Sequence, residues 1–524
     1  MRTSLIFSAS LILAFSGPAC HRAGSETENG SAYQQAETPY VRKAETGKAS
    51  EIYANNCATC HGNDMEGGQG PSLIDKIWIH GDDDAEIEKV IREGVPAKAM
   101  PAFGTMLDAD SINSLIALIR EKGSSPPSGK ALPLPSGAIR SERATFKVDL
   151  ISDKVEIPWS LIWLSDKLML LTERVGHLRT LGTDGTLSAP LKNVPVITDQ
   201  FIHGGFLGLA RDPDYGRNGY IYLAYTDEAV DTLGAAASCK GQGACFDKVS
   251  QIKVIRGKIA DNALVDQKVI WQAPKSTYRA TANFGGRLVF GKDGYLYLSV
   301  GDRIYRPDEA QDLRLPNGKI HRFSRDGKVP PDNPFVHMPN AYPTIWSYGH
   351  RNPQGLAVDS ATGVLWSSEH GPRGGDELNI ISRGGNYGWP FVTLGMGYDG
   401  RPFDPRFPVG RDAPNAKAMD IRIDPKFNPA NTVKPITHWT PSIAVSAITF
   451  YQGQNFPGWH GSLLVGSLRA QKMLRLEIRG AHVEKTETLL QGFGDVRDIA
   501  NGPDGNIYVA LNKPGRIIRL SPAR

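Results

Sequence analysis

Two cysteines and a histidine stand within five residues near the N-terminal end of the chain, in the string Cys57-Ala58-Thr59-Cys60-His61. Two thiols at this spacing, followed at once by a histidine, are the arrangement that attaches haem covalently. Cys57 and Cys60 would form thioethers to the two vinyl groups on one porphyrin edge, and His61 would be the proximal ligand of the iron. A zinc site or a redox-active dithiol is the alternative for the cysteines. The motif therefore predicts an electron carrier.

The iron of such a haem usually takes a second axial ligand, and a methionine thioether suits it because it stabilises the ferrous state. Met100 is the expected ligand. It lies in the proline-bracketed stretch from Val95 to Phe103, which cannot be helical and can present sulfur to the iron. Core packing is the alternative role of this methionine. The competing ligands are Met65, His80 and Met106.

An amphipathic helix is expected directly after this stretch. Between Asp108 and Lys122, four apolar residues recur at helical spacing and give one buried stripe: Ile112, Leu115, Ile116 and Ile119. The attachment motif, the methionine before a proline and this closing helix together resemble a small class I cytochrome c over residues 48 to 122. The resemblance implies a small all-α domain with one covalent haem c.

Length and charge limit what the rest of the chain can be. The 524 residues exceed the size at which a single core stops growing, so two or more domains are expected. The formal net charge is +4 with both signs spread along the chain, so we expect no nucleic acid as a partner. After the first twenty residues, no stretch approaches the roughly 20 apolar residues of a membrane span.

The first twenty residues have the layout of a secretory signal. Arg2 precedes the apolar stretch from Leu5 to Phe15, and small residues then end in Ala19-Cys20. We expect export to the periplasm, with Cys20 either lipidated as a membrane anchor or left by simple cleavage. Residues 21 to 47 would be a disordered tether. In an oxidising compartment, Cys239 and Cys245 are expected to form a disulfide.

A linker rich in Pro, Ser and Gly, residues 123 to 143, separates the helical region from a second domain. From residue 144 onward, a turn with Gly or Asp followed by a short apolar strand recurs six times: residues 166–171, 219–224, 294–299, 363–368, 461–466 and 505–510. Recurrence at roughly fifty residues or more is typical of a propeller. We therefore expect a small all-α cytochrome c domain followed by an all-β six-bladed propeller over residues 144 to 524. A β-sandwich or two smaller all-β domains are the alternative.

Two polar clusters flank the strand of the fourth repeat. The string His350-Arg351-Asn352-Pro353-Gln354-Gly355-Leu356 supplies a guanidinium and an amide, which suit bidentate recognition of a carboxylate. The string Glu369-His370-Gly371-Pro372-Arg373-Gly374-Gly375-Asp376-Glu377 supplies backbone carbonyls and acids, which suit a hard cation such as calcium. Together they predict a ligand with several carboxylates next to a metal ion.

Nearly all of residues 150 to 520 resembles the soluble pyrroloquinoline quinone (PQQ) dependent aldose dehydrogenases, the glucose/sorbosone dehydrogenase family. Besides the two clusters, the matching strings are Gly204-Gly205-Phe206-Leu207-Gly208 with Asp212-Pro213-Asp214, Gly286-Arg287-Leu288-Val289 with Gly301-Asp302, Asn317-Gly318-Lys319-Ile320 with Pro331-Asp332-Asn333-Pro334-Phe335, and Gly384-Gly385-Asn386-Tyr387-Gly388-Trp389-Pro390. The resemblance implies that PQQ lies on the propeller face over a calcium ion and receives a hydride from C1 of a sugar.

The resemblance also implies roles for individual residues. Arg351, Asn352 and Arg469 match PQQ contacts, and His370 stands where the family has a glutamine beside the cofactor. The backbone carbonyls of Gly371 and Pro372 match ligands of the catalytic calcium, and Asp376 matches an acid on the substrate side. Glu377 and Tyr387 would belong to a second, structural calcium site.

The sequence departs from the family where the catalytic histidine should stand, because Asn283 occupies that position and an amide cannot accept a proton at neutral pH. The family's glutamine before the Gly-Leu-Leu-Gly string is matched by His203. An imidazole and an amide have thus exchanged places. We expect His203 to be the general base and Asn283 to orient the substrate, with His370 as the second candidate base.

A haem on the same polypeptide would reoxidise the reduced quinone at high effective concentration. The expected path runs from an aldose, or a related aldehyde or alcohol, through PQQ to the haem and on to an external cytochrome or oxidase. Two rivals remain from the sequence. One is a haem-containing binding or sensing lipoprotein without dehydrogenase activity, and the other is a calcium-dependent propeller hydrolase such as a lactonase.

Overall fold

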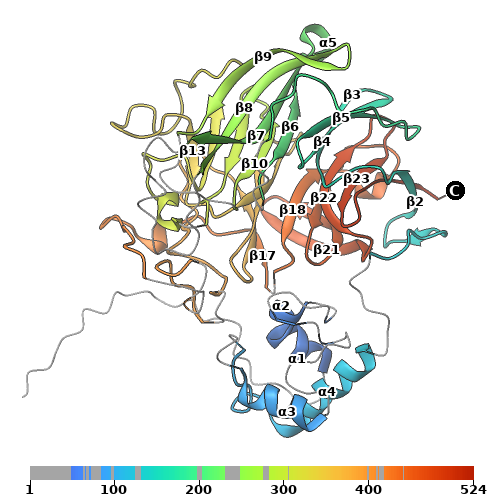
Figure 1. Cartoon of the computed structure of the whole chain (residues 1–524), viewed down its shortest axis with the longest axis vertical. Helices are drawn as coiled ribbons and strands as arrows, with labels where there is room; N and C mark the ends of the chain where they lie inside the picture. The colour runs from blue at the N-terminus through green and yellow to red at the C-terminus, as the bar shows by residue number, and fades with distance from the viewer. Residues whose placement is uncertain are drawn as a thin grey trace, which may run out of the picture. The chain divides into compact units, whose positions relative to one another are not determined.

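The structure is a computed structural model (Figure 1) that describes residues 49–62, 65, 70–71, 73, 84–95, 100–123, 131–197, 203–230, 248–274, 282–304, 306–397, 401–408, 411, 418–440 and 442–523. The signal sequence, the tether, Cys20, His80 and the Cys239–Cys245 pair lie outside these residues, so the expectations for them stay predictions. Within the described ranges, no helix is both long enough and apolar enough to cross a bilayer.

The described part of the N-terminal region contains helices joined by turns and loops. Its helices are α1 (Ala49–Asn56), α2 (Ala58–His61), α3 (Asp84–Glu93) and α4 (Ala109–Gly123). The side chain of Asp108 caps α4, because its Oδ1 accepts a hydrogen bond from the N–H of Ser111 at 2.8 Å. The four apolar residues of the expected stripe are at most 5% exposed, so the helix and its buried face are confirmed.

After the helical region, the strands of the described part of the chain form six separate sheets. The first sheet contains β3 (Pro158–Ser165), β4 (Leu168–Glu173) and β5 (His177–Gly182). The second contains β6 (Phe206–Arg211), β7 (Tyr220–Val230), β8 (Lys248–Ala260) and β9 (Ala263–Gln272). The third contains β10 (Gly285–Phe290), β11 (Leu296–Val300), β12 (Lys319–Phe323) and β13 (Ile345–Tyr348). The fourth sheet contains β14 (Pro353–Val358), β15 (Leu365–Glu369), β16 (Asp376–Ile380) and β17 (Thr437–Trp439). The fifth contains β18 (Val445–Phe450), β19 (Leu463–Ser467), β20 (Lys472–Arg479) and β21 (His482–Gln491).

The sixth sheet joins the two ends of the β domain. It contains β1 (Ile139–Arg140), β2 (Thr145–Ser152), β24 (Arg516–Pro522), β23 (Ile507–Asn512) and β22 (Asp495–Asn501), in this spatial order. The short helices between strands are α5 (Tyr215–Asn218), η2 (Pro307–Ala310), η3 (Pro429–Asn431) and η4 (Pro457–Trp459).

The six sheets are the blades of a propeller. The innermost strands contact one another in a closed ring in the order β3, β6, β10, β14, β18, β22 and back to β3. Each of the six sequence repeats overlaps the second strand of a blade, namely β4, β7, β11, β15, β19 and β23. The expected six-bladed propeller is confirmed, and the β-sandwich alternative is wrong.

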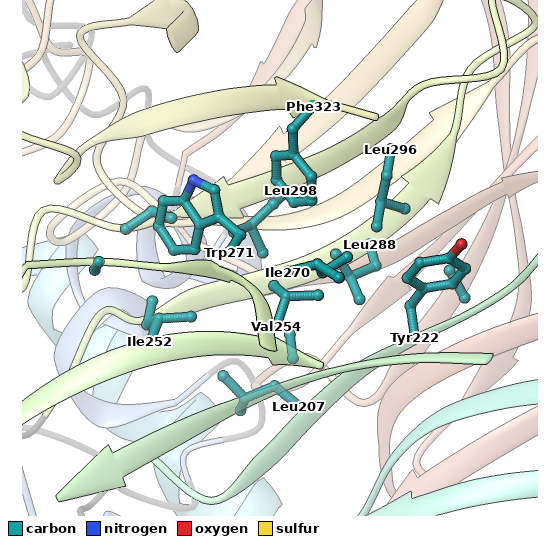
Figure 2. Close-up of a cluster of buried hydrophobic side chains, with 14 of the residues drawn as sticks. Leu207, Tyr222, Ile252, Val254, Ile270, Trp271, Leu288, Leu296, Leu298 and Phe323 are labelled. Carbon is teal, nitrogen blue, oxygen red and sulfur yellow. The ribbon is translucent and has the colours of Figure 1, made fainter. Parts of the chain in front are cut away.

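The hydrophobic core is divided among the spaces between neighbouring blades. Figure 2 shows one such space, in which Tyr222 of β7 and Val254 of β8 pack against Leu288 of β10 and Leu298 of β11. Alternate residues of one strand enter different clusters, because successive side chains point to opposite faces. Leu223, for example, belongs to the cluster on the other face of β7. Burial on both faces explains why the repeats are continuous apolar runs.

The axis of the ring is filled by side chains from β-bulges. The register shifts where the innermost strands begin, and Trp159, Arg287, Gln354 and Arg497 lie at these shifts in four different blades. The guanidinium of Arg287 lies 4.3 Å from the ring of Trp159 and bonds Asp498 Oδ1 at 2.7 Å. Since β10 and β22 are opposite one another in the ring, this ion pair crosses the propeller axis.

Candidate functional site

The two polar clusters of the sequence meet where β14 begins and β15 ends. Glu369, the last residue of β15, is 4% exposed. Its Oε2 accepts the N–H of Arg351 at 2.9 Å, and its Oε1 lies 3.0 Å from Nδ1 of His350. The ring of His350 stacks on that of Tyr387, with 4.4 Å between centroids. This carboxylate therefore holds the segment that carries Arg351 and Asn352.

Arg351 and Asn352 lie directly before β14, and Arg351 lines a recess together with Glu369. Nη1 of Arg351 donates to the carbonyl oxygen of Gly371 at 2.9 Å, and its guanidinium carbon lies 5.3 Å from the ring centroid of Trp389. Oδ1 of Asn352 accepts hydrogen bonds from the N–H of Gly285 at 3.1 Å and from the amide of Gln354 at 3.0 Å. The side-chain oxygen of Asn352 is thus already used in hydrogen bonds within the protein, and its NH2 group is the part suited to contact a ligand.

Glu369 and Glu377 are directly opposite one another on β15 and β16. The amide of Asn379 donates to both, at 3.0 Å and 3.1 Å. Burial, with the charge of Glu369 as a further cause, raises the pKa of Glu377 to about 8. Two carboxylates brought together in this way favour a cation between them. They line a recess of about 10 Å³, roughly the room that one water-sized species needs.

Tyr387 also lines this recess, but its hydroxyl group is used elsewhere. The hydroxyl donates to the carbonyl of Ile380 at 2.6 Å and accepts the N–H of Ser382 at 2.9 Å. Only the backbone of Tyr387 could therefore serve the second calcium site that the resemblance implies. Within the described ranges, no group of three or more His, Cys, Asp and Glu side chains has metal-binding geometry.

The loop after β15 gathers backbone oxygens. A Cβ on Gly371 would lie 2.0 Å from the carbonyl oxygen of Gly374 and 2.5 Å from that of Gly375, so the loop closes tightly only with glycine here. Backbone oxygens are ligands that calcium accepts, but the carbonyl oxygen of Gly371 accepts a hydrogen bond from Nη1 of Arg351 in this structure, so the calcium site expected at Gly371 and Pro372 stays a prediction.

Asp376 holds this loop in place. Its carboxylate is fully buried and accepts hydrogen bonds from the N–H of Gly371 at 3.0 Å and from the hydroxyl of Ser442 at 2.8 Å. Burial raises the pKa of this carboxyl group. These contacts give Asp376 a positioning role for the loop, and the substrate contact that the resemblance implied stays a prediction.

His203 lies among positive charges. Burial of the ring, together with the charges of Arg497, Arg174 and Arg351, lowers the pKa of His203 to about 4. The residue is exposed on one side, so burial accounts for only part of the lowered pKa. The three neighbouring cations also lower the pKa, and their effect does not require the ring to be buried. The glycine that follows at position 205 is required, because a Cβ there would lie 1.8 Å from the carbonyl oxygen of Arg174.

Arg497 is the site residue that the sequence reasoning missed. Its Nη1 donates to Oε1 of Gln354 at 2.9 Å, while its Nε is buried with no hydrogen-bond partner in the described structure. Burial, with repulsion from Arg287 and Arg174, lowers the pKa of Arg497, although a guanidinium stays charged at neutral pH. No motif flanks this arginine, and its place at a bulge of an innermost strand is the signal that could have identified it.

Arg469 follows β19 on the side where β18 begins. Its Nη2 is also buried and has no hydrogen-bond partner among the described residues. Buried donors without acceptors are unfavourable unless a ligand satisfies them. Arg497, with Arg174 and Arg351 around His203, fits a ligand that carries several carboxylates. PQQ is such a ligand. The expected cofactor contact of Arg469 stays a prediction.

Asn283 is held by Asp302. Its amide donates to Oδ1 of Asp302 at 2.9 Å, and since a carboxylate only accepts, this group must be the NH2. The carbonyl oxygen of the amide is therefore left as an acceptor for another group. Trp389 Nε1 donates to the second oxygen of Asp302 at 2.8 Å. Burial raises the pKa of Asp302, and the cluster places Asn283 as a hydrogen-bond acceptor but not as a base.

His370 lies close to His203 but is constrained by the fold. Its Nε2 is 2.7 Å from the carbonyl oxygen of Val445, so Nε2 carries the proton and Nδ1 is the free acceptor. Burial, with the charges of Arg351 and Arg497, lowers the pKa of His370 to about 3. Both imidazoles are thus neutral at physiological pH.

The haem motif lies on α2 and the turn before it. Nδ1 of His61 is 2.8 Å from the carbonyl oxygen of Pro71, which fixes Nδ1 as the donor and leaves Nε2 for a metal. A Cβ on Gly70 would lie 2.7 Å from Cε1 of His61, so the ring packs against a glycine. Burial raises the pKa of the Cys57 thiol to about 12, which disfavours the thiolate that a zinc site or reactive dithiol needs.

The methionine ligand stays a prediction. Met100 is half-buried, and its backbone pairs with that of Val95, at 2.9 Å and 3.2 Å. Of the competing ligands, Met65 is 1% exposed within the helical core, and Met106 packs against the edge of that core. The pairing gives Met100 a defined position at the end of its loop.

Comparison with known proteins agrees with this geometry. The Glucose / Sorbosone dehydrogenase family matches residues 155–519, and the family of subunit III of cbb3-type cytochrome c oxidase matches residues 44–119. An aldose sugar dehydrogenase of Escherichia coli (strain K12) is 37% identical over 393 residues, which are 74% of this chain and 96% of that protein. Quinoprotein glucose dehydrogenase B of Acinetobacter calcoaceticus is 26% identical over 443 residues, which cover 73% of this chain and 89% of that protein.

The solved structures agree as well. The soluble aldose sugar dehydrogenase from Escherichia coli in its apo form has a TM-score of 0.60 and 33% identity, and the match covers 72% of this chain and 100% of that chain. The β domain has the blades, the two polar clusters and the three arginines around His203 described above, and helices with the haem attachment motif precede it. The chain belongs to the glucose/sorbosone dehydrogenase family of oxidoreductases, with a cytochrome c domain before the propeller.

Proposed function

We propose that this protein is a quinohaemoprotein that oxidises an aldose, or a related aldehyde or alcohol, with PQQ on the propeller and passes the electrons to a covalent haem c. The observation that carries the proposal is the set of three cations around His203, namely Arg174, Arg351 and Arg497, of which Arg497 has a buried donor without an acceptor among the described residues. A ligand with several carboxylates satisfies both the charge and the donor. The names of the relatives point to the same cofactor and substrate class.

The residues of the recess divide into those that bind the cofactor and those that hold calcium. Arg351, Arg469 and Arg497 would donate to carboxylates, and the NH2 group of Asn352 would donate to a cofactor oxygen. The carbonyls of Gly371 and Pro372 would hold one calcium ion. Glu377 and the backbone of Tyr387, with Glu369 opposite, would hold a second. When bound, PQQ supplies the two-electron acceptor that side chains lack.

His203 is the proposed proton acceptor. The carbonyl oxygen of Asn283 would accept a hydrogen bond from the hydroxyl of the substrate and fix its orientation, while Asp302 holds the amide. The imidazole of His203 is neutral above a pH of about 4 and can take the hydroxyl proton. His370 is less suited, because Nε2 is bound to the carbonyl of Val445.

The N-terminal domain would receive the electrons. Cys57 and Cys60 would form the thioethers, His61 would bind the iron through Nε2, and Met100 would be the sixth ligand. A donor and an acceptor on one polypeptide meet at high effective concentration. We further propose that the protein works after export, in the periplasm, and that an external cytochrome or oxidase accepts the electrons. Cys20 offers a place for a lipid anchor.

Reconstitution tests this function directly. The full chain, with haem attached, is titrated with PQQ and calcium, and the haem Soret and alpha bands are followed after an aldose is added. Reduction that requires PQQ, calcium and aldose together supports the proposal. As a control, Arg497→Gln should need far more PQQ for the same signal.

The competing functions give other results. If PQQ does not bind and only dithionite reduces the haem, the protein is a binding or sensing protein, an outcome that Asn283 in the histidine position would then explain. If the protein hydrolyses lactones without PQQ or haem, the propeller is a calcium-dependent hydrolase. Either result overturns the proposed function.

A further inference from the structure

The third blade contains a fully buried lysine that the proposed function does not use. Lys319, the first residue of β12, is 0% exposed, and lysines are almost never buried to this extent unless partners compensate the charge. Its Nζ donates to three backbone carbonyl oxygens, those of Asn317 at 2.7 Å, Glu309 at 2.8 Å and Ala310 at 3.0 Å. All the donors of an ammonium group are thus used.

The three carbonyl oxygens require a cation between them. Each oxygen carries partial negative charge, so oxygens that converge on one point repel one another unless a positive group lies there. Only the ammonium form of Lys319 has three N–H donors. Burial lowers the pKa of Lys319 to about 7, and the charges of Asp312 and Glu309 oppose this shift. Below that pH the group is an ammonium ion that holds all three oxygens.

Lys319 closes the loop from Arg306 to Gly318, which follows β11. The ammonium joins the carbonyls of Glu309 and Ala310, at the end of the short helix η2, to the carbonyl that precedes Gly318. Gly318 permits this close approach, because its φ is +66° and a Cβ there would lie 2.4 Å from Cβ of Ala310. The loop is therefore fixed from within by a single side chain.

The closed loop supports the segment that carries the proposed cofactor contacts. The carbonyl oxygen of Ala310, which the ammonium binds, also accepts the N–H of Gly349 at 2.9 Å. The carbonyl oxygen of Gly318 accepts the N–H of His350 at 3.1 Å. Gly349 and Arg351 both line the recess. A shift of the loop would therefore move the backbone on which Arg351 stands.

A second series of contacts leads from the loop to Asn283. The amide of Gln311 donates to the carbonyl oxygen of Trp389 at 2.7 Å. The indole of Trp389 donates to Asp302 at 2.8 Å, and Asp302 accepts the amide of Asn283 at 2.9 Å. The loop is thus connected by hydrogen bonds to the residue that would orient the substrate.

We propose that Lys319 is a positioning residue of the site, whose ammonium group fixes the loop from Arg306 to Gly318 and through it sets the places of Arg351 and Asn283. The inference rests on the proposed function, which gives Arg351 and Asn283 their roles. Lys319 itself touches neither Arg351 nor Asn283 in the printed contacts of its ammonium group. Its loss should therefore displace both residues without removing either.

The test compares Lys319→Met with Lys292→Met at pH 6, in the full chain loaded with PQQ and calcium. Methionine has an unbranched side chain like that of lysine but no N–H donor. In Lys319→Met, kcat for an aldose should fall about 10- to 100-fold, because a small displacement of the reacting groups costs this much. PQQ should also bind about tenfold more weakly by calorimetry. Lys292 is the matched control, since this exposed lysine between β10 and β11 also donates to a carbonyl oxygen, that of Ala361 at 3.1 Å; its variant should behave like the wild type.

A chemical rescue separates the cation from the volume of the side chain. Lys319→Ala removes a propyl chain and its ammonium group, so a propylammonium ion matches the missing part. Propylammonium should raise kcat of this variant at least about tenfold, and 1-propanol, which is similar in size but uncharged, should not. Equal effects of the two compounds overturn the inference. Wild-type kcat and PQQ affinity in Lys319→Met overturn it as well.

Hydrogen exchange at the amide of Gly349 provides a readout without turnover. This N–H donates to the carbonyl of Ala310, so it should exchange at least about tenfold faster in Lys319→Met than in the wild type. Unchanged exchange overturns the inference. If exchange is faster but no aldose reduces the haem of the wild type, the role of Lys319 in the loop stands and the proposed function fails.

A second variant covers the case in which the Lys319 variants do not fold. Gln311→Leu leaves the ammonium and its three carbonyls in place and breaks the hydrogen bond to Trp389. It should lower kcat about tenfold while PQQ affinity stays at the wild-type level, because the series through Gln311 leads to Asn283 and not to Arg351. A wild-type kcat in Gln311→Leu overturns the inference.

Discussion

Replacing His203 tests the proposed chemistry most sharply. In His203→Gln the family's amide returns to this position, and no proton acceptor is left next to the substrate except His370, whose Nε2 is bound to Val445. Loss of a general base costs about 10²–10⁴-fold in kcat, or about 2.7–5.4 kcal/mol in activation free energy. Affinity for PQQ should stay the same, because Arg351, Arg469 and Arg497 are untouched.

A second substitution in the same variant should restore activity. Asp302 lies 2.9 Å from the NH2 of Asn283, so an imidazole placed there by Asn283→His would donate one N–H to Asp302 and present its other nitrogen to the substrate. The double variant His203→Gln/Asn283→His should regain at least about tenfold of the lost kcat. The assay is haem reduction at saturating aldose in protein loaded with PQQ and calcium, with PQQ affinity measured in parallel.

The protonation of His203 gives an independent check. Burial of the ring and three neighbouring arginines disfavour its charged form, so in the protein without PQQ the pKa of the ring should lie well below the usual value of about 6.5. The neutral, basic form is then lost only as the pH falls through the lowered pKa. Arg497→Gln removes one cation and should raise this pKa, as measured by NMR. A kcat that His203→Gln leaves at the wild-type level would refute the role of this residue.

Four further perturbations have defined outcomes. Met100→Ala should abolish the weak long-wavelength absorption of a ferric iron bound to thioether sulfur, and a band that survives reassigns the ligand. Arg287→Leu should lower the free energy of unfolding by about 3–5 kcal/mol, because Asp498 stays buried without its partner. In a urea titration, the double variant Arg287→Leu/Asp498→Leu should recover most of this loss. If the double variant loses as much free energy of unfolding as the single one, the role of the ion pair is contradicted. Arg497→Gln should weaken PQQ binding about 10- to 100-fold by calorimetry, as loss of a hydrogen bond to a charged group implies. Glu377→Gln should remove the stabilisation by the second calcium ion, so that a chelator lowers the Tm of this variant less than that of the wild type.

Local patterns in the sequence were enough to predict the propeller. Each repeat is the second strand of a blade and is covered on both faces. Its continuous apolar run can therefore be recognised as a strand from the local sequence alone. The helix after Asp108 was equally clear, because a cap and a helical stripe stand together. The two polar clusters around β15 could also be predicted from the sequence, because a single short strand joins them and places them close together.

The parts that were missed depend on ring closure. Arg497 has no motif around it, and it comes near His203 and Arg174 only because β22 closes the ring next to β3. Asp376 and Glu377 are neighbours in sequence but point to opposite sides of β16, and sequence alone does not show which one faces a ligand. The bond between Trp389 and Asp302 spans 87 residues, and no spacing rule reaches that far.

The position of β24 has a consequence for biosynthesis. This strand, made from the last residues of the chain, pairs with β2 on one side and with β23 on the other. The ribosome must therefore synthesise β24 before the sixth blade can assemble, whereas the helices with the haem attachment motif emerge some four hundred residues earlier. A product that lacks Arg516 to Pro522 would expose two unpaired strand edges, which are templates for aggregation. Premature termination should thus yield insoluble protein even though every residue of the recess has been synthesised.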